Sequence, residues 1–369
     1  MSQAQLEIQL IAAIVAVACA LPGVFLVLRR MAMMSDAISH TVLLGIVLAF
    51  FITKNINSPL LLLGAALMGV ITVSLVELLN RTRLVREDAA IGLVFPAIFS
   101  AAVILISRFA GDVHLDTDAV LLGELAFAPF NRLRLFNLDF GPQALYSTGG
   151  ILLLNIVVIF LLYKELKLAT FDPALAAALG FAPAVIHYGL MTLVSLTAVG
   201  AFDAVGSVLV VAFMIAPPAA AYLLTDRLSR MLGYSALIGI FSALSGYWLA
   251  HWLDASIAGS MATMTGVSVL TAYLLAPERG LVAQARSRRA QRTEFALTML
   301  TMHIAHHTAT HEAEQENRVV RLNEHLKWSS QFAMEIVGIG ERRGLVRQER
   351  GLLVLTESGL KRSQQEFSS

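Results

Sequence analysis

The sequence predicts an all-α membrane protein with about eight or nine spanning helices, followed by a small α+β domain at the C-terminus. Of its 369 residues, 57% are hydrophobic and only 14% are charged, against about 25% charged in an ordinary soluble domain. Charge is also unevenly distributed, with 28 charged side chains in residues 1–276 and 25 in the much shorter stretch 277–369. We therefore expect a membrane domain over residues 1–280 and a separate cytoplasmic domain over residues 281–369.

Nine apolar segments have about the length that a helix needs to cross the hydrocarbon core of a bilayer. They are residues 6–28, 36–53, 59–79, 89–109, 143–163, 183–201, 204–224, 231–253 and 259–276. Lys and Arg of short loops gather on the cytoplasmic side, and nine of them lie in one set of loops against four in the other. Nine spans would place the N-terminus outside and the C-terminal domain inside, whereas eight would place the N-terminus inside.

Two connections between the segments are longer than the rest. Residues 110–142 are expected on the outer side, partly helical. Residues 164–182 are expected on the inner side, where Asp172-Pro173 predicts the start of a short helix and Gly180 predicts its end.

A carboxylate and an imidazole stand four residues apart near the start of the second segment, as Asp36 and His40. This spacing places them on one helix face. Ionisable groups within a span are costly and therefore mark functional sites, and this mixed pair suits Mn²⁺, Fe²⁺ or Zn²⁺. The alternative is an Asp–His hydrogen bond that neutralises both groups near a helix end.

Other polar or irregular positions are weaker candidates. Asp203, between the sixth and seventh segments, is either a loop or cap residue or part of a substrate path. Pro217-Pro218 should kink or break the seventh helix, because proline lacks the N–H that an interior helical residue donates. The chain has no G-x-x-x-x-G-K-[ST] phosphate loop and no G-x-S-x-G elbow. Its single cysteine, Cys19, excludes an internal disulfide.

Three ordered stretches resemble the membrane subunits of ABC-type manganese, zinc and iron importers. They are RRMAMMSDAISHTVLLGIVLAF, KELKLATFDPALAAALGF and AFDAVGSVLVVAFMIAPPAAAYLLTDRL, and the resemblance covers about residues 5–280. It looks closest to the manganese/iron branch. The family pattern more often has Leu, Ala and Pro where this chain has Ile38, Thr41 and Leu44.

The resemblance implies a site, partners and a location. Asp36 and His40 map onto the family's acidic and imidazole positions in the translocation path. It implies a second permease subunit (identical or related), two ATPase subunits, an extracytoplasmic metal-binding protein and the bacterial inner membrane. The metal is cargo rather than a resident cofactor. The ATPase-docking segment is expected at Phe171, Asp172, Pro173, Ala174, Leu179 and Gly180.

The C-terminal stretch predicts helices over 293–311, 314–326 and 329–343, then two strands around Gly351 and a final helix. This order resembles the winged helix of metal-dependent repressors. Its recognition-helix position has few basic groups and the net charge of the chain is +1, so nucleic-acid binding is not favoured. A regulatory or protein-contact role is the default.

Four histidines, His303, His306, His307 and His311, form a second candidate metal site in this stretch. The alternative is an exposed helix face that happens to contain histidines.

The sequence leaves three functions open for the whole chain. The favoured one is the metal-importing permease subunit. The others are a membrane-anchored, metal-responsive regulator and a secondary metal transporter that works alone.

Overall fold

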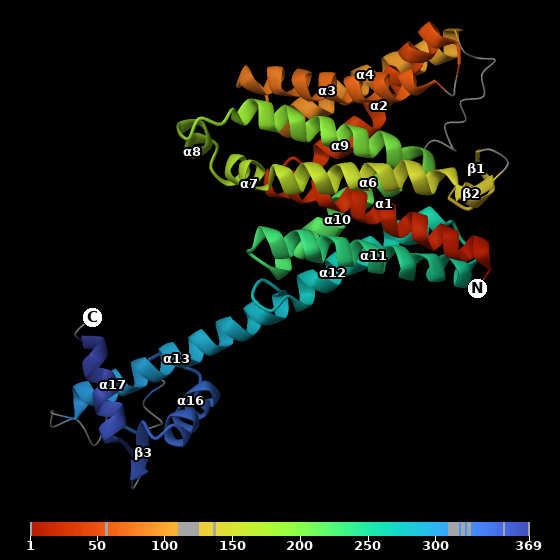
Figure 1. The fold of residues 1–369 in the computed structure, drawn as a ribbon. Helices are drawn as coiled ribbons and strands as arrows, with labels where there is room; N and C mark the ends of the chain where they lie inside the picture. Colours follow the sequence, from red (N-terminus) through yellow and green to blue (C-terminus); the bar gives the residue numbers. More distant parts are fainter. Residues whose placement is uncertain are drawn as a thin grey trace. The chain divides into compact units, whose positions relative to one another are not determined.

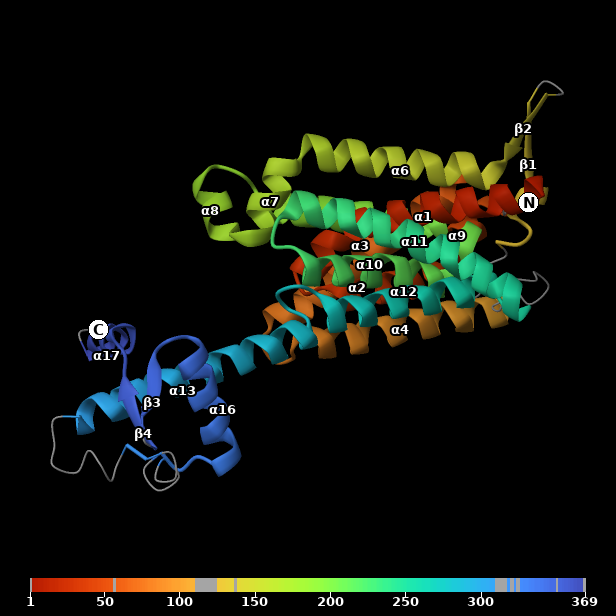
Figure 2. The ribbon, with the colours of Figure 1, turned by 90° about the horizontal axis from the view of Figure 1, so that it is seen from below.

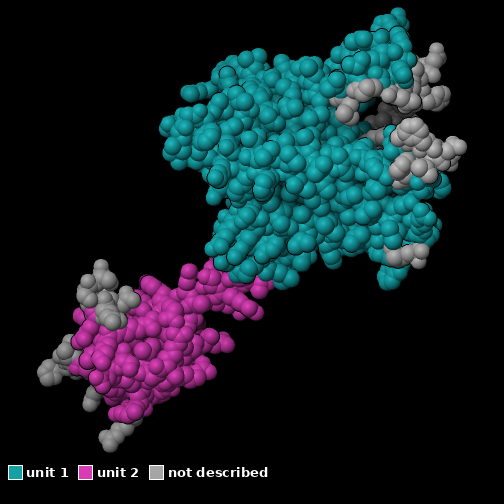
Figure 3. Space-filling view, viewed as in Figure 1, with its two compact units in different colours: residues 1–280 teal, residues 281–369 magenta. Residues whose placement is uncertain are grey.

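The computed structural model describes residues 2–55, 58–109, 125–135, 138–308, 317–318, 322, 326–349 and 351–367. The chain divides into two compact units, Met1–Gly280 and Leu281–Ser369, which Figure 3 draws in teal and magenta. The division falls close to the point at which the density of charged residues rises along the sequence.

The first unit contains the predicted bundle of spanning helices. In the part of the chain that the structure describes, nine helices are long and apolar enough to cross a membrane. They are α1 (Gln3–Leu28), α2 (Ala32–Thr53), α3 (Pro59–Arg81), α4 (Glu87–Phe109), α6 (Gln143–Leu161), α9 (Pro183–Val205), α10 (Ser207–Leu224), α11 (Leu228–Leu253) and α12 (Ile257–Leu275). The predicted all-α polytopic class is confirmed.

Helix α1 forms the centre of this bundle. It packs against α6, α9, α10 and α11, and Figure 1 shows it between the α2–α4 group and the α10–α12 group. Its largest buried side chains include Ile11, Phe25 and Leu26. Helices α4 and α6, by contrast, expose most of their length and form the periphery of the unit.

A proline inside α1 explains one buried polar contact. Pro22 has no N–H to donate to the carbonyl of Ala18, one turn earlier. The side-chain amide of Asn155, fully buried on α6, donates to that carbonyl at 2.8 Å and to the hydroxyl of Thr197 on α9 at 2.9 Å. One amide thus supplies the missing donor and joins three helices.

The paired prolines of α10 do not break the helix, and of the two predicted outcomes the kink stays a prediction. The helix runs from Ser207 to Leu224 with Pro217 and Pro218 buried inside it. Pro218 cannot donate to the carbonyl of Met214, and Gly23 of α1 lies directly against that carbonyl. Because glycine has no side chain, α1 approaches α10 closely there, and neighbouring helices cover the irregular backbone.

The two long connections have defined structure. The described part of the first contains a 3₁₀ turn, η1 (Ala128–Phe130), and an antiparallel hairpin of β1 (Arg132–Leu135) and β2 (Leu138–Pro142) that was not predicted; the expected partly helical character stays a prediction. Residues 110–124 lie outside the described part. In this hairpin, Arg132 forms ion pairs with Asp139 at 2.7 Å and with Glu7 of α1 at 3.6 Å.

The second connection contains α7 (Tyr163–Phe171) and α8 (Pro173–Ala178). The carboxylate of Asp172 accepts a hydrogen bond from the backbone N–H of Leu175 at 2.9 Å and so caps α8. Gly180 follows the helix at a φ of 87°, a conformation that favours glycine. The predicted start and end of this short helix are confirmed.

The second unit contains α13 (Leu281–His307), α16 (Ser330–Arg342), β3 (Val346–Glu349), β4 (Leu352–Leu355) and α17 (Glu357–Phe367). The strands are antiparallel, with Gly351 in the turn between them as predicted. Its core includes Leu297, Leu300, Ile304, Ile336 and Leu353. Helix α13 begins well before the predicted residue 293, and most of the predicted helix 314–326 lies outside the described residues. The winged-helix interpretation stays a prediction.

Candidate metal-binding site

Asp36 and His40 lie side by side on the first turns of α2. The Nε2 atom of His40 is 3.5 Å from the Oδ1 atom of Asp36. Their side chains are 40% and 25% exposed, respectively, in this single chain. The predicted pair therefore exists as a geometric unit, with one oxygen and one nitrogen facing the same space.

The local fold of α2 fixes which way this pair faces. The neighbouring residues Ser35, Ile38 and Thr41 are buried, and the hydroxyls of Ser35 and Ser39 donate to carbonyls of the same helix at 2.9 and 2.8 Å. Farther along, α2 meets α3 with Gly45 against Gly64, where a Cβ on either glycine would clash with the other helix. The buried face is thereby fixed, and the half-exposed face carries the ionisable pair.

Two aromatic rings of α4 cover one side of His40. Its ring centroid lies 5.2 Å from that of Phe95 and 5.7 Å from that of Phe99. These rings restrict the imidazole without offering it a charge, while its Nε2 atom points toward Asp36. Such restriction is what holds a ligand in a defined rotamer.

The spacing of the pair matches the geometry of a shared cation. Oxygen and nitrogen ligands of borderline metals lie about 2.1 Å from the ion. Two such ligands 3.5 Å apart would subtend an angle of about 110° at the metal, close to tetrahedral. Among the described residues, no group of three or more His, Cys, Asp or Glu side chains could hold a metal. The Asp36–His40 pair therefore stays a predicted metal site in this chain.

The other candidates have mixed outcomes. Asp203 lies in the last turn of α9, and its side chain is outside the described part. His311 also lies outside it. The rings of His303 and His307 are 4.7 Å apart, centroid to centroid, and His306 is 5.2 Å from His307. These three residues form no metal-binding group in the described part of the chain, so the histidine site stays a prediction.

A polar cavity that sequence reasoning missed lies near the turn between α1 and α2. It has a volume of about 240 Å³, and Arg29, Met34, Glu77 and His187 are among its lining residues. The guanidinium of Arg29 donates to the hydroxyl of Thr170 on α7 at 3.1 Å and lies 3.2 Å from the Nδ1 atom of His187 on α9. In the sequence, the only sign of this cluster is that charged residues, among them Arg29 and Glu77, stand near the ends of predicted spans.

Glu77 forms the acidic wall of that cavity. Its carboxylate accepts hydrogen bonds from the hydroxyl of Tyr188 at 2.6 Å and from Arg81 at 2.7 Å. The cavity is lined by residues of α2, α3 and α9 and by the turn that follows α1, at the end of the bundle where α2 begins.

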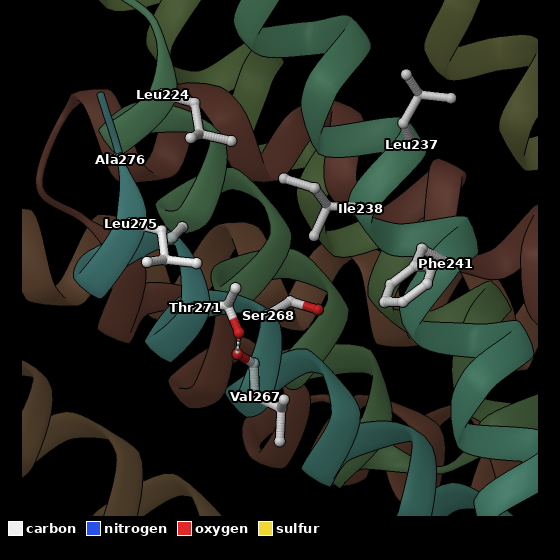
Figure 4. A pocket seen from close by; sticks show the side chains of 10 residues that line it. Leu224, Leu237, Ile238, Phe241, Val267, Ser268, Thr271, Leu275 and Ala276 are labelled. Atoms are coloured by element: carbon white, nitrogen blue, oxygen red, sulfur yellow. Dashed lines mark hydrogen bonds between the residues drawn. The ribbon is translucent and has the colours of Figure 1, made fainter. Parts of the chain in front are cut away.

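A larger cavity, of about 430 Å³, lies among the ends of α10, α11 and α12. Figure 4 shows Leu237, Phe241, Val267 and Leu275 along its walls, with the hydroxyl of Thr271 turned onto the carbonyl of Val267. No titratable side chain lines this cavity, so it offers a cation no charged ligand.

In the described part of the chain, nine apolar helices and a half-exposed carboxylate–imidazole pair on one of them define a multi-span membrane protein. The chain belongs to the ABC 3 transport family, whose sequence profile matches residues 2–276. This confirms the family that the sequence motifs indicated.

Characterised relatives are similar over most of their lengths. The chain is 48% identical to the zinc transport system membrane protein TroD of Treponema pallidum over 97% of this chain and 98% of that protein. It is 51% identical to the manganese transport system membrane protein MntD of Bacillus subtilis, over 73% and 92%. The similarity to TroD thus extends through the second unit.

A solved structure, PsaBC from Streptococcus pneumoniae in complex with Fab, has a similar fold. The TM-score is 0.63 at 26% identity, covering 75% of this chain and 94% of that one. Because the relatives' names include both zinc and manganese, the manganese/iron branch stays a prediction.

Proposed function

We propose that this chain is the membrane-spanning subunit of an ABC importer that passes Mn²⁺, Fe²⁺ or Zn²⁺ across the bacterial inner membrane into the cytoplasm. The observation that carries the proposal is the Asp36–His40 pair on α2, with its 3.5 Å spacing. The names of the relatives, which are zinc and manganese transport proteins, support the same class of cargo.

Exposure of the pair supports assembly with a second permease subunit. An ionised carboxylate in contact with lipid is costly, so such groups face protein or a water-filled cavity. Asp36 is 40% exposed in the single chain, and a second subunit would cover that face and enclose a path. The remaining ligands of the ion would then come from that subunit, from water or from backbone oxygens.

The α7–α8 connection supports docking of ATPase subunits. Phe171 and Leu179, at the two ends of α8, are 57% and 61% exposed, and Leu175 between them is also exposed. Three exposed apolar side chains, on the capped helix α8 and on the residues that flank it, suit a protein contact. Arg29 joins α7 to the turn that precedes α2, so a displacement of α7 would reach the helix that carries Asp36.

Transport would follow from a difference in metal affinity between two states of the assembly. An extracytoplasmic binding protein would deliver the ion to the open path, and closure of the ATPase pair would displace α7 and α8. Separation of the Asp36–His40 pair from the remaining ligands would then weaken binding and release the ion to the cytoplasm. The second unit would lie in the cytoplasm and regulate this cycle or contact a partner.

Uptake of radioactive Mn²⁺ or Zn²⁺ by proteoliposomes containing the assembled importer tests the proposal. Asp36→Ala and His40→Ala should each reduce uptake to the background without loss of assembly. Asp88→Asn and His251→Ala change the same residue types at exposed helix ends and should transport normally. Uptake near the wild-type rate in either Asp36→Ala or His40→Ala would refute the site.

Two variants of the same assay separate the alternative functions. Deletion of residues 281–369 should leave uptake intact if the chain is a permease subunit. If the chain is a membrane-anchored regulator, the same deletion should abolish its control of gene expression while uptake stays normal. Omission of the ATPase subunits should abolish uptake, whereas a transporter that works alone would continue.

A further inference from the structure

The first half of α13 carries four arginines and no acid. Arg286, Arg288, Arg289 and Arg292 are exposed, and the first acidic residue of the helix is Glu294. The buried residues of α13 all lie between Ala296 and Ile304. Residues 281–295 bury no side chain, although the guanidinium of Arg292 lies over the ring of Phe332 at 4.5 Å. We call residues 286–292 the basic segment.

The basic segment is electrostatically unfavourable by itself. Arg288 and Arg292 are four residues apart, and Arg289 is three residues from both Arg286 and Arg292. Like charges at these spacings repel on a helix. Positive charge in the first turns of a helix also opposes the helix dipole. Within the described part of the chain, Arg286, Arg288 and Arg289 form no ion pair that would offset either effect.

Four other basic residues of the second unit have acidic partners. Arg343 and Arg362 both pair with Glu294, Arg347 lies 3.6 Å from Glu349, and Lys361 lies 3.6 Å from Glu357. Arg342 donates only to a backbone carbonyl, so it adds a further positive charge, but the only run of adjacent basic residues without acidic partners in the described part of the unit is the basic segment. An external anion is the partner that such a surface lacks.

The chain keeps this segment close to a bilayer. Helix α12, the last spanning helix, ends at Leu275, and Arg286 follows eleven residues later. Even a fully extended chain would separate the two by only about 40 Å. This tether gives lipid headgroups a high effective concentration at the segment, an advantage that a soluble nucleic acid does not have.

We propose that the basic segment binds the anionic phospholipid headgroups of the membrane that the first unit spans. Guanidinium groups bind phosphate oxygens in a bidentate fashion, and basic residues that directly follow a spanning helix are attracted to anionic leaflets. Bound headgroups would neutralise the repulsion among the arginines and hold α13 at the bilayer surface. This inference does not depend on the transported ion.

Hydrogen exchange of the full-length chain in lipid nanodiscs tests this proposal. In discs of equimolar phosphatidylcholine and phosphatidylglycerol, amides 284–293 should exchange several-fold more slowly than in phosphatidylcholine alone. Raised salt should remove the difference, because screening weakens contacts at the surface. Exchange in the β3–β4 hairpin should be the same in both lipids and reports that the unit is folded.

The variant Arg286→Gln/Arg288→Gln/Arg289→Gln should lose the lipid-dependent protection. Arg342→Gln/Arg347→Gln/Lys361→Gln, which removes three basic residues elsewhere in the unit, should keep it. If amides 284–293 of the wild-type protein exchange at the same rate in discs with and without phosphatidylglycerol, the proposal is overturned. Protection that requires added ATPase subunits or duplex DNA instead of phosphatidylglycerol would overturn it in favour of those partners.

Discussion

Asn155 is a buried polar residue whose side-chain amide joins three helices of the first unit. It is fully buried on an apolar helix, and its amide donates to a carbonyl of α1 that Pro22 cannot satisfy. A buried carbonyl without a partner costs more than an ordinary hydrogen bond contributes. The polar residue is therefore required by a proline on another helix.

Replacement of Asn155 by Leu should destabilise the protein by about 1–3 kcal/mol, because the Ala18 carbonyl loses its donor. The melting temperature of the purified protein in detergent, followed by size-exclusion chromatography, measures the loss. The loss should be smaller in a Pro22→Ala background, where residue 22 regains an N–H for that carbonyl. An equal loss in both backgrounds would contradict this account.

The sequence predicted contacts between residues correctly where the two residues stand a few positions apart on the same helix. Asp36 and His40 are four residues apart, and helical geometry alone predicted that they meet. Asn155 and Pro22 lie on different helices far apart in the chain, so no local pattern connects them. The contacts among Arg29, Thr170 and His187 could not be predicted for the same reason, because only the packing of α1, α7 and α9 brings these residues together.

Helix α1 meets α10 at a point where only glycine fits. A Cβ added to Gly23 would overlap the carbonyl of Met214, and this backbone carbonyl cannot move aside as a flexible side chain would. Gly23→Ala should therefore separate the two helices, lower the melting temperature and reduce the yield of folded protein. Gly266→Ala on α12 is the matched control, because a Cβ there meets open space and alanine favours helix. Similar losses in both variants would argue against the close contact.

Glu294 links three helices of the second unit. Hydrogen bonds from Arg362 of α17 and from Arg343, which follows α16, hold the pKa of the Glu294 carboxyl below its usual range. A carboxyl with a lowered folded-state pKa stabilises the fold above its unfolded pKa of about 4.3, and the stabilisation is lost as the pH falls toward the folded value.

Glu294→Gln should therefore accelerate hydrogen exchange of α17 roughly two- to fivefold at pH 7, the range expected for exposed ion pairs. After correction for intrinsic exchange rates, the difference from wild type should shrink once the pH falls below the unfolded pKa of about 4.3 and disappear below the lowered folded-state pKa of Glu294. Glu357→Gln, which removes an exposed i,i+4 partner of Lys361 within α17, is the control and should have a smaller effect. A difference that persists unchanged in acid would exclude the ion pairs as its cause.

At the scale of elements, the sequence predicted best where hydrophobic length or capping residues decide the structure. The spanning helices and the Asp172–Gly180 helix follow from such local signals. No such local signal predicted the β1–β2 hairpin or the early start of α13. Helix α13 extends through residues 281–292 without burying a side chain, because Ala, Arg and Gln favour helix even where no apolar periodicity marks it.

The whole molecule combines a membrane unit that carries a half-exposed ionisable pair with a second unit that has its own hydrophobic core. The half-exposed Asp36 lies on a helix of spanning length, a position that is stable only if protein or water covers it. The family profile ends at residue 276, yet the similarity to TroD continues to nearly the end of the chain. We therefore expect cargo recognition to belong to the first unit and the second unit to modulate it.

Electron spin-echo spectroscopy of Mn²⁺ bound to the assembled full-length protein tests the central claim most directly. The account predicts a nitrogen coupling from one imidazole that His40→Ala removes and that Asp36→Ala weakens through loss of bound Mn²⁺. The coupling should persist when His303, His306 and His307 are all replaced by alanine. A nitrogen coupling that survives in His40→Ala, or tight Mn²⁺ binding with no nitrogen coupling in the wild type, would contradict the account.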